Sequence, residues 1–162
     1  LQLRELALKE VAFRVEKKVE NEIVSIDKGV RHEKFLACIS SNEKTPRHII
    51  RKAARLASRY NTVFSALYVQ TPVESTERIN LASQRHLLNH FKLVTELGGE
   101  VLQVASANVL DEIIKTCQEK QITTICMGQP AFKMPSTLFS ISKYKKFLAS
   151  LAQMNIDLII LA

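Results

Sequence analysis

The feature that most constrains this chain is an alternation of short apolar runs with longer amphipathic segments, which begins near residue 34. The clearest apolar run is Phe64–Val69, and a helical pattern lies on each side of it. A central strand of a parallel sheet is buried on both faces and is therefore apolar almost throughout. The pattern predicts an α/β fold in which residues 64–69 form the central strand of a parallel sheet.

The other segments extend this prediction to a five-stranded parallel sheet that is flanked by helices on both faces. The expected strands are residues 35–39, 62–69, 101–104, 122–127 and 156–161. The expected helices are residues 45–60, 75–97, 109–120 and 142–154, with Thr45 and Asn108 as N-terminal caps and Gly98-Gly99 as a left-handed stop.

Residues 1–31 follow a different pattern, because apolar residues recur there at spacings near three and four among alternating Lys, Arg and Glu. This spacing predicts an amphipathic helix, which ends near Ile26–Gly29. We expect residues 1–31 to form an extra N-terminal linker helix and residues 32–162 to form one domain. The chain begins with Leu rather than Met, which favours a fragment of a longer protein.

The composition is that of a basic globular protein with a formal net charge of +7 at pH 7. This charge favours an anionic partner, such as a phosphorylated small molecule, a nucleic acid, a membrane surface or an acidic neighbouring domain. A charge excess that only improves solubility is the alternative. The 3 cysteines have no metal-binding or paired spacing, which favours a reducing compartment over a disulfide framework.

Polar loops follow three of the predicted strands and could meet at one edge of the sheet. Ligands of open α/β sheets bind at the carboxyl ends of the strands. Backbone amides, hydroxyls and a nearby arginine suit a polar or phosphorylated ligand, although the same residue types also form ordinary turns. The candidates are Ser40-Ser41-Asn42, Tyr68–Thr71 and Gly128-Gln129-Pro130, with Arg47 at the start of a helix.

Catalysis has little support in the sequence. No Walker or dinucleotide-binding glycine motif follows a predicted strand, and no G-x-S-x-G motif or carboxylate pair is evident. His86 and His90 lie four residues apart on an expected helix, but no cysteine or acidic ligand accompanies them. A solvated helix face is therefore favoured over a zinc site, and we expect a binding domain with no catalytic residue and no metal.

Several short motifs together resemble the universal stress protein domain, which has an open, Rossmann-like sheet. These motifs are KFLACI at residues 34–39, RKAARLASRY at 51–60, FSALYV at 64–69 followed by TP, and MGQPA at 127–131. They are most similar to the version found in the cytoplasmic region of the KdpD family of potassium-responsive sensor histidine kinases. The segment LRELAL near the N-terminus also resembles the part that precedes this domain in that family.

This resemblance implies a non-catalytic sensory domain on the cytoplasmic side of a membrane-anchored kinase. Its partners would be the other domains of the parent kinase, with a response regulator reached only through the kinase domain and with no nucleic acid. The ligand in KdpD proteins of several Gram-positive bacteria is cyclic di-AMP. The resemblance therefore implies that ligand binding regulates kinase signalling and the expression of potassium uptake genes.

The ligand motif of those Gram-positive proteins has the form S-x-S, a longer gap, and then F-T-A-x-Y. Phe64, Ala66 and Tyr68 match it, and Ser65 replaces threonine. Ser41 takes the place of the first serine and Glu43 that of the second, so that Ser40 could substitute. With the loops, the implied ligand-binding residues are Ser40, Ser41, Arg47, Phe64, Ser65, Ala66, Tyr68, Gly128, Gln129 and Pro130.

Other interpretations remain open at the level of sequence. Stress proteins that bind ATP carry a G-x-x-G motif and a further glycine, whereas Ala131 stands three residues after Gly128 and no glycine follows, which disfavours ATP. Phe64 and Ala66 could serve only core packing. The domain could also lack nucleotide binding and dock an acidic partner or a neighbouring kinase domain, and the apolar strand at residues 156–161 could pair two copies.

Overall fold

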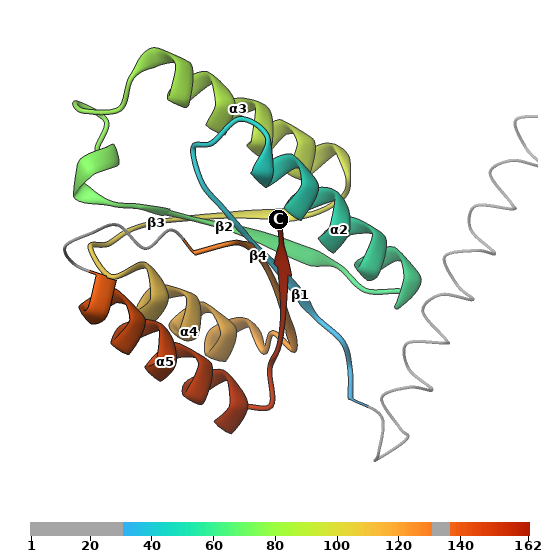
Figure 1. Cartoon of the computed structure of the whole chain (residues 1–162). Coiled ribbons are helices and arrows are strands. Elements are labelled where there is room, and N and C mark those ends of the chain that lie inside the picture. Colours follow the sequence, from blue (N-terminus) through green and yellow to red (C-terminus); the bar gives the residue numbers. More distant parts are fainter. Residues whose placement is uncertain (1–30, 131–136) are drawn as a thin grey trace, which may run out of the picture. The chain divides into compact units, whose positions relative to one another are not determined.

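The computed structural model of the chain describes residues 31–130 and 137–162, which form a five-stranded parallel sheet with two helices on each face (Figure 1). The chain divides into two units, residues 1–32 and 33–162, and the sheet belongs to the second. The expected linker helix over residues 1–31 lies outside the described residues except for Arg31.

The order of elements confirms the expected alternation of strands and helices. The strands are β1 (Phe35–Ile39), β2 (Phe64–Gln70), β3 (Glu100–Ala105), β4 (Thr124–Gly128) and β5 (Asp157–Leu161). The helices are α2 (Thr45–Arg59), α3 (Leu81–Glu96), α4 (Val109–Lys120) and α5 (Thr137–Gln153), and a short 3₁₀ helix, η1 (Pro72–Glu74), follows β2.

The strands lie in the order β3-β2-β1-β4-β5, and all neighbouring pairs are parallel. The central strand is therefore β1, and the expectation that residues 64–69 form the centre is wrong. Residues 64–69 are all buried, because β2 is an interior strand between β1 and β3. The chain runs outward from β1 to β3 and then crosses to β4, which places a topological switch point between β1 and β4.

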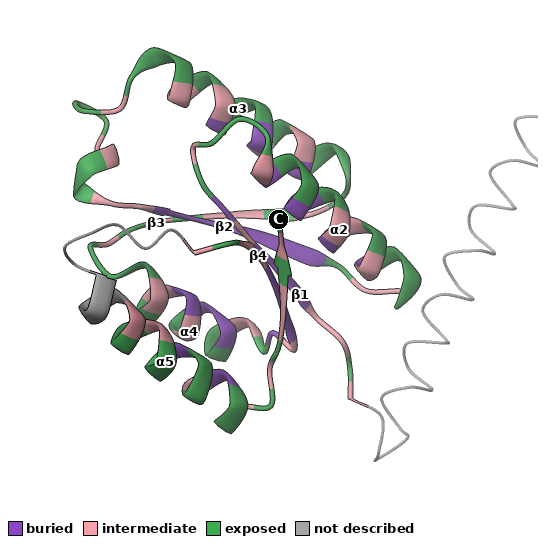
Figure 2. Cartoon of the chain, in the orientation of Figure 1, coloured by how far each residue is buried: buried purple, intermediate pink, exposed green. Residues whose placement is uncertain are grey.

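Two cores cover the faces of this sheet, as the buried inner sides of the helices show (Figure 2). Helices α2 and α3 pack on one face against Phe35, Phe64 and Tyr68. Helices α4 and α5 pack on the other face against Leu36 and Leu67. The alternation of side chains along β1 and β2 thus supplies both cores from the same two strands.

The starts of the helices differ from the expected ones. Helix α3 begins at Leu81 rather than at residue 75, because the Asn80 side chain accepts a hydrogen bond of 2.7 Å from the backbone N–H of Ser83. Lys44, not Thr45, is at the N-cap position of α2. Asn108 is at the N-cap position of α4 as expected, but its side chain makes no capping bond. Helix α5 begins at Thr137, earlier than the expected residue 142.

The helices return to the amino edge of the sheet through one kind of turn. A residue with positive φ follows the end of each of the four helices, and the next residue donates a backbone hydrogen bond to a carbonyl of the last helical turn. After α3, for example, Gly98 has φ 80° and the Gly99 N–H donates to the Val94 carbonyl at 2.9 Å. This is the Schellman motif, and it confirms the expected left-handed stop. The residues with positive φ are Asn61, Gly98, Gln121 and Asn155.

Candidate ligand-binding site

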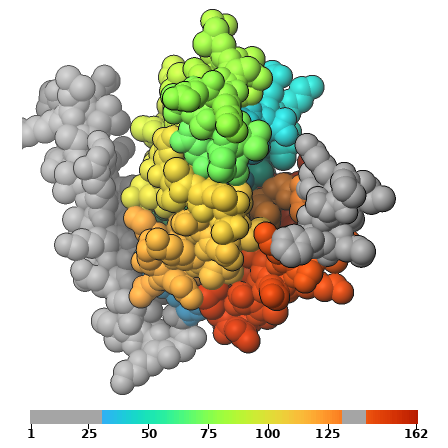
Figure 3. Space-filling view, turned by 90° about the vertical axis from the view of Figure 1, so that its left-hand side faces the viewer, coloured from blue at the N-terminus to red at the C-terminus, as the bar shows by residue number. Residues whose placement is uncertain are grey.

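Two adjoining cavities open at the carboxyl edge of the sheet, which Figure 3 views face on. One of about 310 Å³ lies between the ends of β1 and β2, and one of about 340 Å³ lies between the ends of β1 and β4. Ligand sites typically have volumes of about 300–1,000 Å³ and are found at switch points of α/β sheets. Both cavities are lined by Cys38, Ile39, Ser40, Val109 and Ile113.

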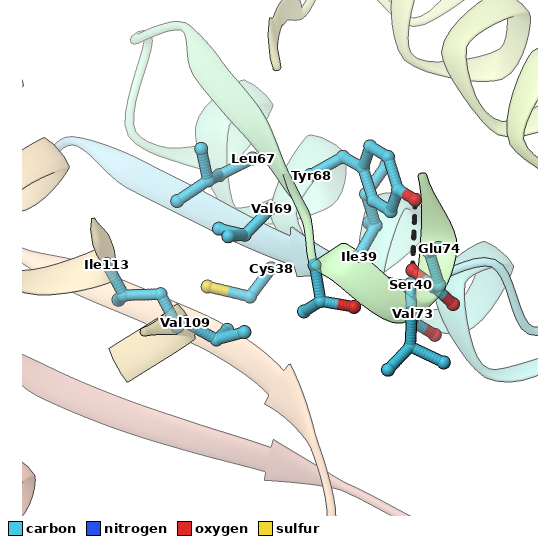
Figure 4. Close-up of a pocket in the computed structure, with 11 residues that line it drawn as sticks. Cys38, Ile39, Ser40, Leu67, Tyr68, Val69, Val73, Glu74, Val109 and Ile113 are labelled. Carbon is cyan, nitrogen blue, oxygen red and sulfur yellow. Dashed lines mark hydrogen bonds between the residues drawn. The ribbon is translucent and has the colours of Figure 1, made fainter. Parts of the chain in front are cut away.

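The first cavity has an apolar part and a polar part (Figure 4). Val69, Val109 and Ile113 surround the sulfur of Cys38, and Tyr68 and Glu74 lie on the other side. Burial raises the pKa of the Cys38 thiol, and Cys117 and Cys126 add to this effect. Because the thiol stays protonated at neutral pH, Cys38 is a wall of the cavity and a poor nucleophile.

Glu74 joins the ends of β1 and β2. Its Oε1 accepts a hydrogen bond from the Ser41 hydroxyl, and its Oε2 accepts one of 2.9 Å from the Tyr68 hydroxyl (Figure 4 shows the bond to Tyr68). Burial raises the pKa of Tyr68, and the bond to Glu74 raises it further, so the phenol is a protonated donor. No pattern in the sequence predicts this carboxylate, because its contact with Ser41 depends on the tertiary fold.

The turn that carries Glu74 lies between the first cavity and a further cavity. The cavity of about 310 Å³ lies on one side. A further hollow of about 400 Å³ lies between Gln70–Thr76 and Ala105–Ala107. In the view onto this edge, the chain around residue 75 (green) stands beside the chain around residue 105 (yellow) (Figure 3). The Gln70 side chain also holds the turn, since it donates a hydrogen bond of 3.1 Å to the Glu74 carbonyl.

His90 is a second residue that the sequence did not single out for this edge. Its ring is 1% exposed, its Nε2 lies 2.6 Å from the Asn42 carbonyl oxygen, and its Nδ1 is buried without a hydrogen-bond partner. Burial lowers the pKa of His90, the bond to Asn42 opposes this, and the charges of Arg47 and His86 lower it further. The interpretation of this histidine as part of a solvated face is wrong, because it follows the buried Leu87 by three residues on the same side of α3.

The residues that the structure describes contain neither a cluster of possible metal ligands nor a helix that could cross a membrane. Across residues 31–130 and 137–162, no three His, Cys, Asp or Glu side chains are grouped so that they could hold a metal ion. No helix within these residues has both the length and the hydropathy that a bilayer requires.

The fold is shared with solved universal stress proteins. The universal stress protein of Archaeoglobus fulgidus in complex with dAMP has a TM-score of 0.54 and 11% identity, over 82% of this chain and 98% of that chain. A universal stress protein in complex with cAMP has a TM-score of 0.55 and 13% identity, over 80% of this chain and 96% of that chain. At such low identities, these similarities concern the fold alone.

Curated proteins include relatives of higher sequence identity than these solved structures. No protein-family model matches the chain. The chain is 37% identical over 132 residues to the Sensor protein KdpD of Clostridium acetobutylicum, and 32% identical over 132 residues to that of Escherichia coli. These alignments cover 78% and 80% of this chain. The chain is a universal stress protein-like domain homologous to the KdpD sensor proteins. It spans only 14% of the length of each of these two relatives.

Several of the expected site residues of this KdpD-type domain lie together. Ser40 lines both cavities, Tyr68 lines the first, and Gly128-Gln129-Pro130 line the second. Ser41 is connected to Tyr68 through Glu74. A Cβ at Gly128 would lie 3.0 Å from the Thr45 Cγ2 atom, so even a methyl group would crowd this wall of the second cavity.

Four other expected residues of the KdpD-type domain line neither of these cavities. Phe64 and Ser65 lie at the amino end of β2, where the Phe64 ring is in the core and the Ser65 hydroxyl donates to Glu100 at 3.3 Å. Ala66 is fully buried, and Arg47 is exposed on the first turn of α2. The expected motif FSALY is therefore divided between the two ends of one strand.

Proposed function

We propose that this domain is the ligand-sensing part of a KdpD-type, potassium-responsive histidine kinase and that it binds a nucleotide at the carboxyl edge of the sheet. The observation that carries the proposal is the pair of cavities that share the end of β1. An apolar wall suits a base, and the hydroxyls and backbone groups beside it suit phosphate. The complexes of similar universal stress proteins with dAMP and cAMP support an adenine nucleotide.

Cyclic di-AMP is the nucleotide that we favour. It carries two adenines and two phosphates, and the two adjoining cavities offer two places for such halves. Ser40 lies where the cavities meet, Ser41 and Tyr68 supply hydroxyls, and Gly128 and Gln129 supply backbone groups. ATP is disfavoured because no glycine follows Gly128 to form the expected phosphate loop.

The domain would act as a regulatory module without catalysis of its own. Ligand binding would change its contacts with other domains of the parent kinase, and only the kinase domain would reach the response regulator. The parent protein would be anchored in the membrane with this domain in the cytoplasm, without contact with nucleic acid. The edge strand β5 could pair two copies, because one side of it has no neighbouring strand in the described sheet.

Calorimetric titration of the 162-residue chain tests this function. We expect saturable binding of cyclic di-AMP, but not of ATP or cyclic di-GMP, at moderate salt that screens unspecific attraction. Ser40→Ala should weaken binding by about fivefold through loss of one hydrogen bond. Ser58→Ala, an exposed change on α2, is the matched control and should leave binding unchanged. The absence of heat from all nucleotides would contradict the proposal.

A second function, the docking of an acidic partner or a neighbouring kinase domain, is favoured by the surface of α2. Arg47, Arg51, Arg55 and Arg59 recur at every fourth position and are exposed, and the helix contains no acidic residue. Such a row attracts anionic surfaces. This function would give no saturable signal with nucleotides. It would instead give binding to an acidic protein that Arg51→Glu abolishes.

A further inference from the structure

The Glu74 carboxylate already uses the two hydroxyls that a ligand would need. Ser41 and Tyr68 both donate to it, one to each carboxylate oxygen. A hydroxyl group has a single proton to donate. Neither side chain can therefore donate to a phosphate oxygen while its bond to Glu74 persists.

The charge of Glu74 acts in the same direction. Its side chain lines the first cavity. Glu96 pairs with Lys92 and Glu100 pairs with Lys120, whereas Glu74 has no such ion pair within the described residues. A carboxylate that no cation compensates repels a phosphate at short range, and it does so more strongly where water is partly excluded.

The turn that carries Glu74 can move at low cost. None of the three residues of η1 is buried, and Val73 is 75% exposed. Hollows lie on both sides of the turn. Segments with few buried contacts open locally with small free energies. The two hydroxyl bonds of Glu74, together with the bond from Gln70 to the Glu74 carbonyl, are therefore the side-chain bonds that hold this turn beside the first cavity.

We propose that Glu74 is a built-in competitor that occupies the hydroxyls of Ser41 and Tyr68 until an anionic ligand displaces it. The ligand phosphate takes over the hydroxyls of Ser41 and Tyr68, the carboxylate moves into water, and residues 72–74 move with it. The state in which Glu74 holds these hydroxyls raises the apparent Kd, since only the fraction of molecules with free hydroxyls can bind. This inference rests on the proposed function, and it names the residue that sets the ligand threshold of the same site.

Glu74→Gln tests the competitor directly, because it keeps the size of the side chain but removes its charge. The apparent Kd for cyclic di-AMP should fall by about tenfold, as expected for the loss of hydrogen bonds to a charged acceptor. Glu77→Gln removes the same charge from an exposed position nearby and should change the Kd by less than about twofold. Glu74→Ala, which removes both the charge and the two hydrogen bonds, replaces Glu74→Gln if that variant does not fold, and it should lower the apparent Kd in the same direction.

A second titration with inorganic pyrophosphate separates this inference from the proposed function. One outcome is that the unmodified chain binds cyclic di-AMP while Glu74→Gln binds it no more tightly than Glu77→Gln does. That result would contradict the role of Glu74 as a competitor and would leave the proposed function standing. If no variant binds cyclic di-AMP but Glu74→Gln binds pyrophosphate more tightly than the unmodified chain does, the role of Glu74 as a competitor is supported and cyclic di-AMP is contradicted as the ligand. If no chain binds either anion, both fail.

Discussion

The two edges of the sheet are built in different ways. At the amino edge, each of the four described helices, α2 to α5, ends in the same backbone turn. At the carboxyl edge the loops differ from one another, and particular side chains connect them, as Glu74 connects with Ser41 and His90 with Asn42. Substitutions at the amino edge should therefore change stability, whereas substitutions at the carboxyl edge should change ligand binding or the response to pH.

The largest effect is expected from Phe64→Ala at the amino end of β2. The ring is 2% exposed, and a Cβ on Gly99 would lie 2.5 Å from its Cζ atom, so the ring fills its space tightly. Its loss should lower the free energy of unfolding by about 3–5 kcal/mol, measured by denaturant unfolding.

Two variants sharpen this assignment of Phe64 to the core. Val63→Ala changes the neighbouring residue, whose side chain is 68% exposed, and should cost less than about 0.5 kcal/mol. Phe64→Leu keeps an apolar side chain and should leave the Kd for cyclic di-AMP unchanged in the folded chain. Loss of binding in folded Phe64→Leu would return this residue to the ligand site.

A smaller effect, and one that depends on pH, is expected from His90 at the carboxyl edge. Burial lowers its pKa in the folded chain, so the unfolded chain takes up a proton more readily. The free energy of unfolding should be largest above the unfolded pKa of about 6.5 and should fall as the pH drops below it. Denaturant unfolding at about pH 7.5 and about pH 5.5 measures this slope.

His90→Gln should flatten that slope, because glutamine keeps a donor for the Asn42 carbonyl but does not titrate. His48→Gln, a change of an exposed histidine on α2, should leave the slope as it is. Equal slopes in His90→Gln and the parent chain would show that the buried ring does not control the pH response.

The smallest effect is a gain in stability from Gln121→Gly at the amino edge. Gln121 has φ 55°, a conformation that costs most residues with a side chain about 1–2 kcal/mol and costs glycine little. After the added entropy of the unfolded glycine, we expect a gain of up to about 1 kcal/mol. Gln118→Gly, inside α4, should instead destabilise by about 1 kcal/mol. Thermal unfolding of both variants measures the contrast, and a shift of the same sign in both would contradict it.

The fold could be predicted from the sequence because each buried strand and each amphipathic helix has a local pattern. The identity of the central strand could not, since β1 and β2 are both interior strands and only pairing across the chain distinguishes them. The start of α3 was misplaced because Ile79 continues the apolar spacing, although Asn80 ends it with a capping bond. That capping residue was visible in the sequence.

The candidate site was predictable to the extent that parallel strands bring their carboxyl ends together. Ser40, Tyr68 and Gly128 lie at that edge for this reason. Glu74 could not be found in the same way, since its bond to Ser41 joins residues 33 positions apart. The burial of His90 was visible in its spacing from Leu87, because residues three apart lie on the same face of a helix.

The repeated turn at the amino edge has a consequence for how such a domain can be altered. Each of these joints depends on backbone bonds and on one residue that tolerates positive φ, which is Asn, Gly or Gln here. A strand and the helix after it, with the carboxyl-edge loop between them, can therefore be grafted from a homologue as one block, with the splices at these residues. Ligand preference can then diverge through the loops of the opposite edge, while the scaffold is inherited unchanged.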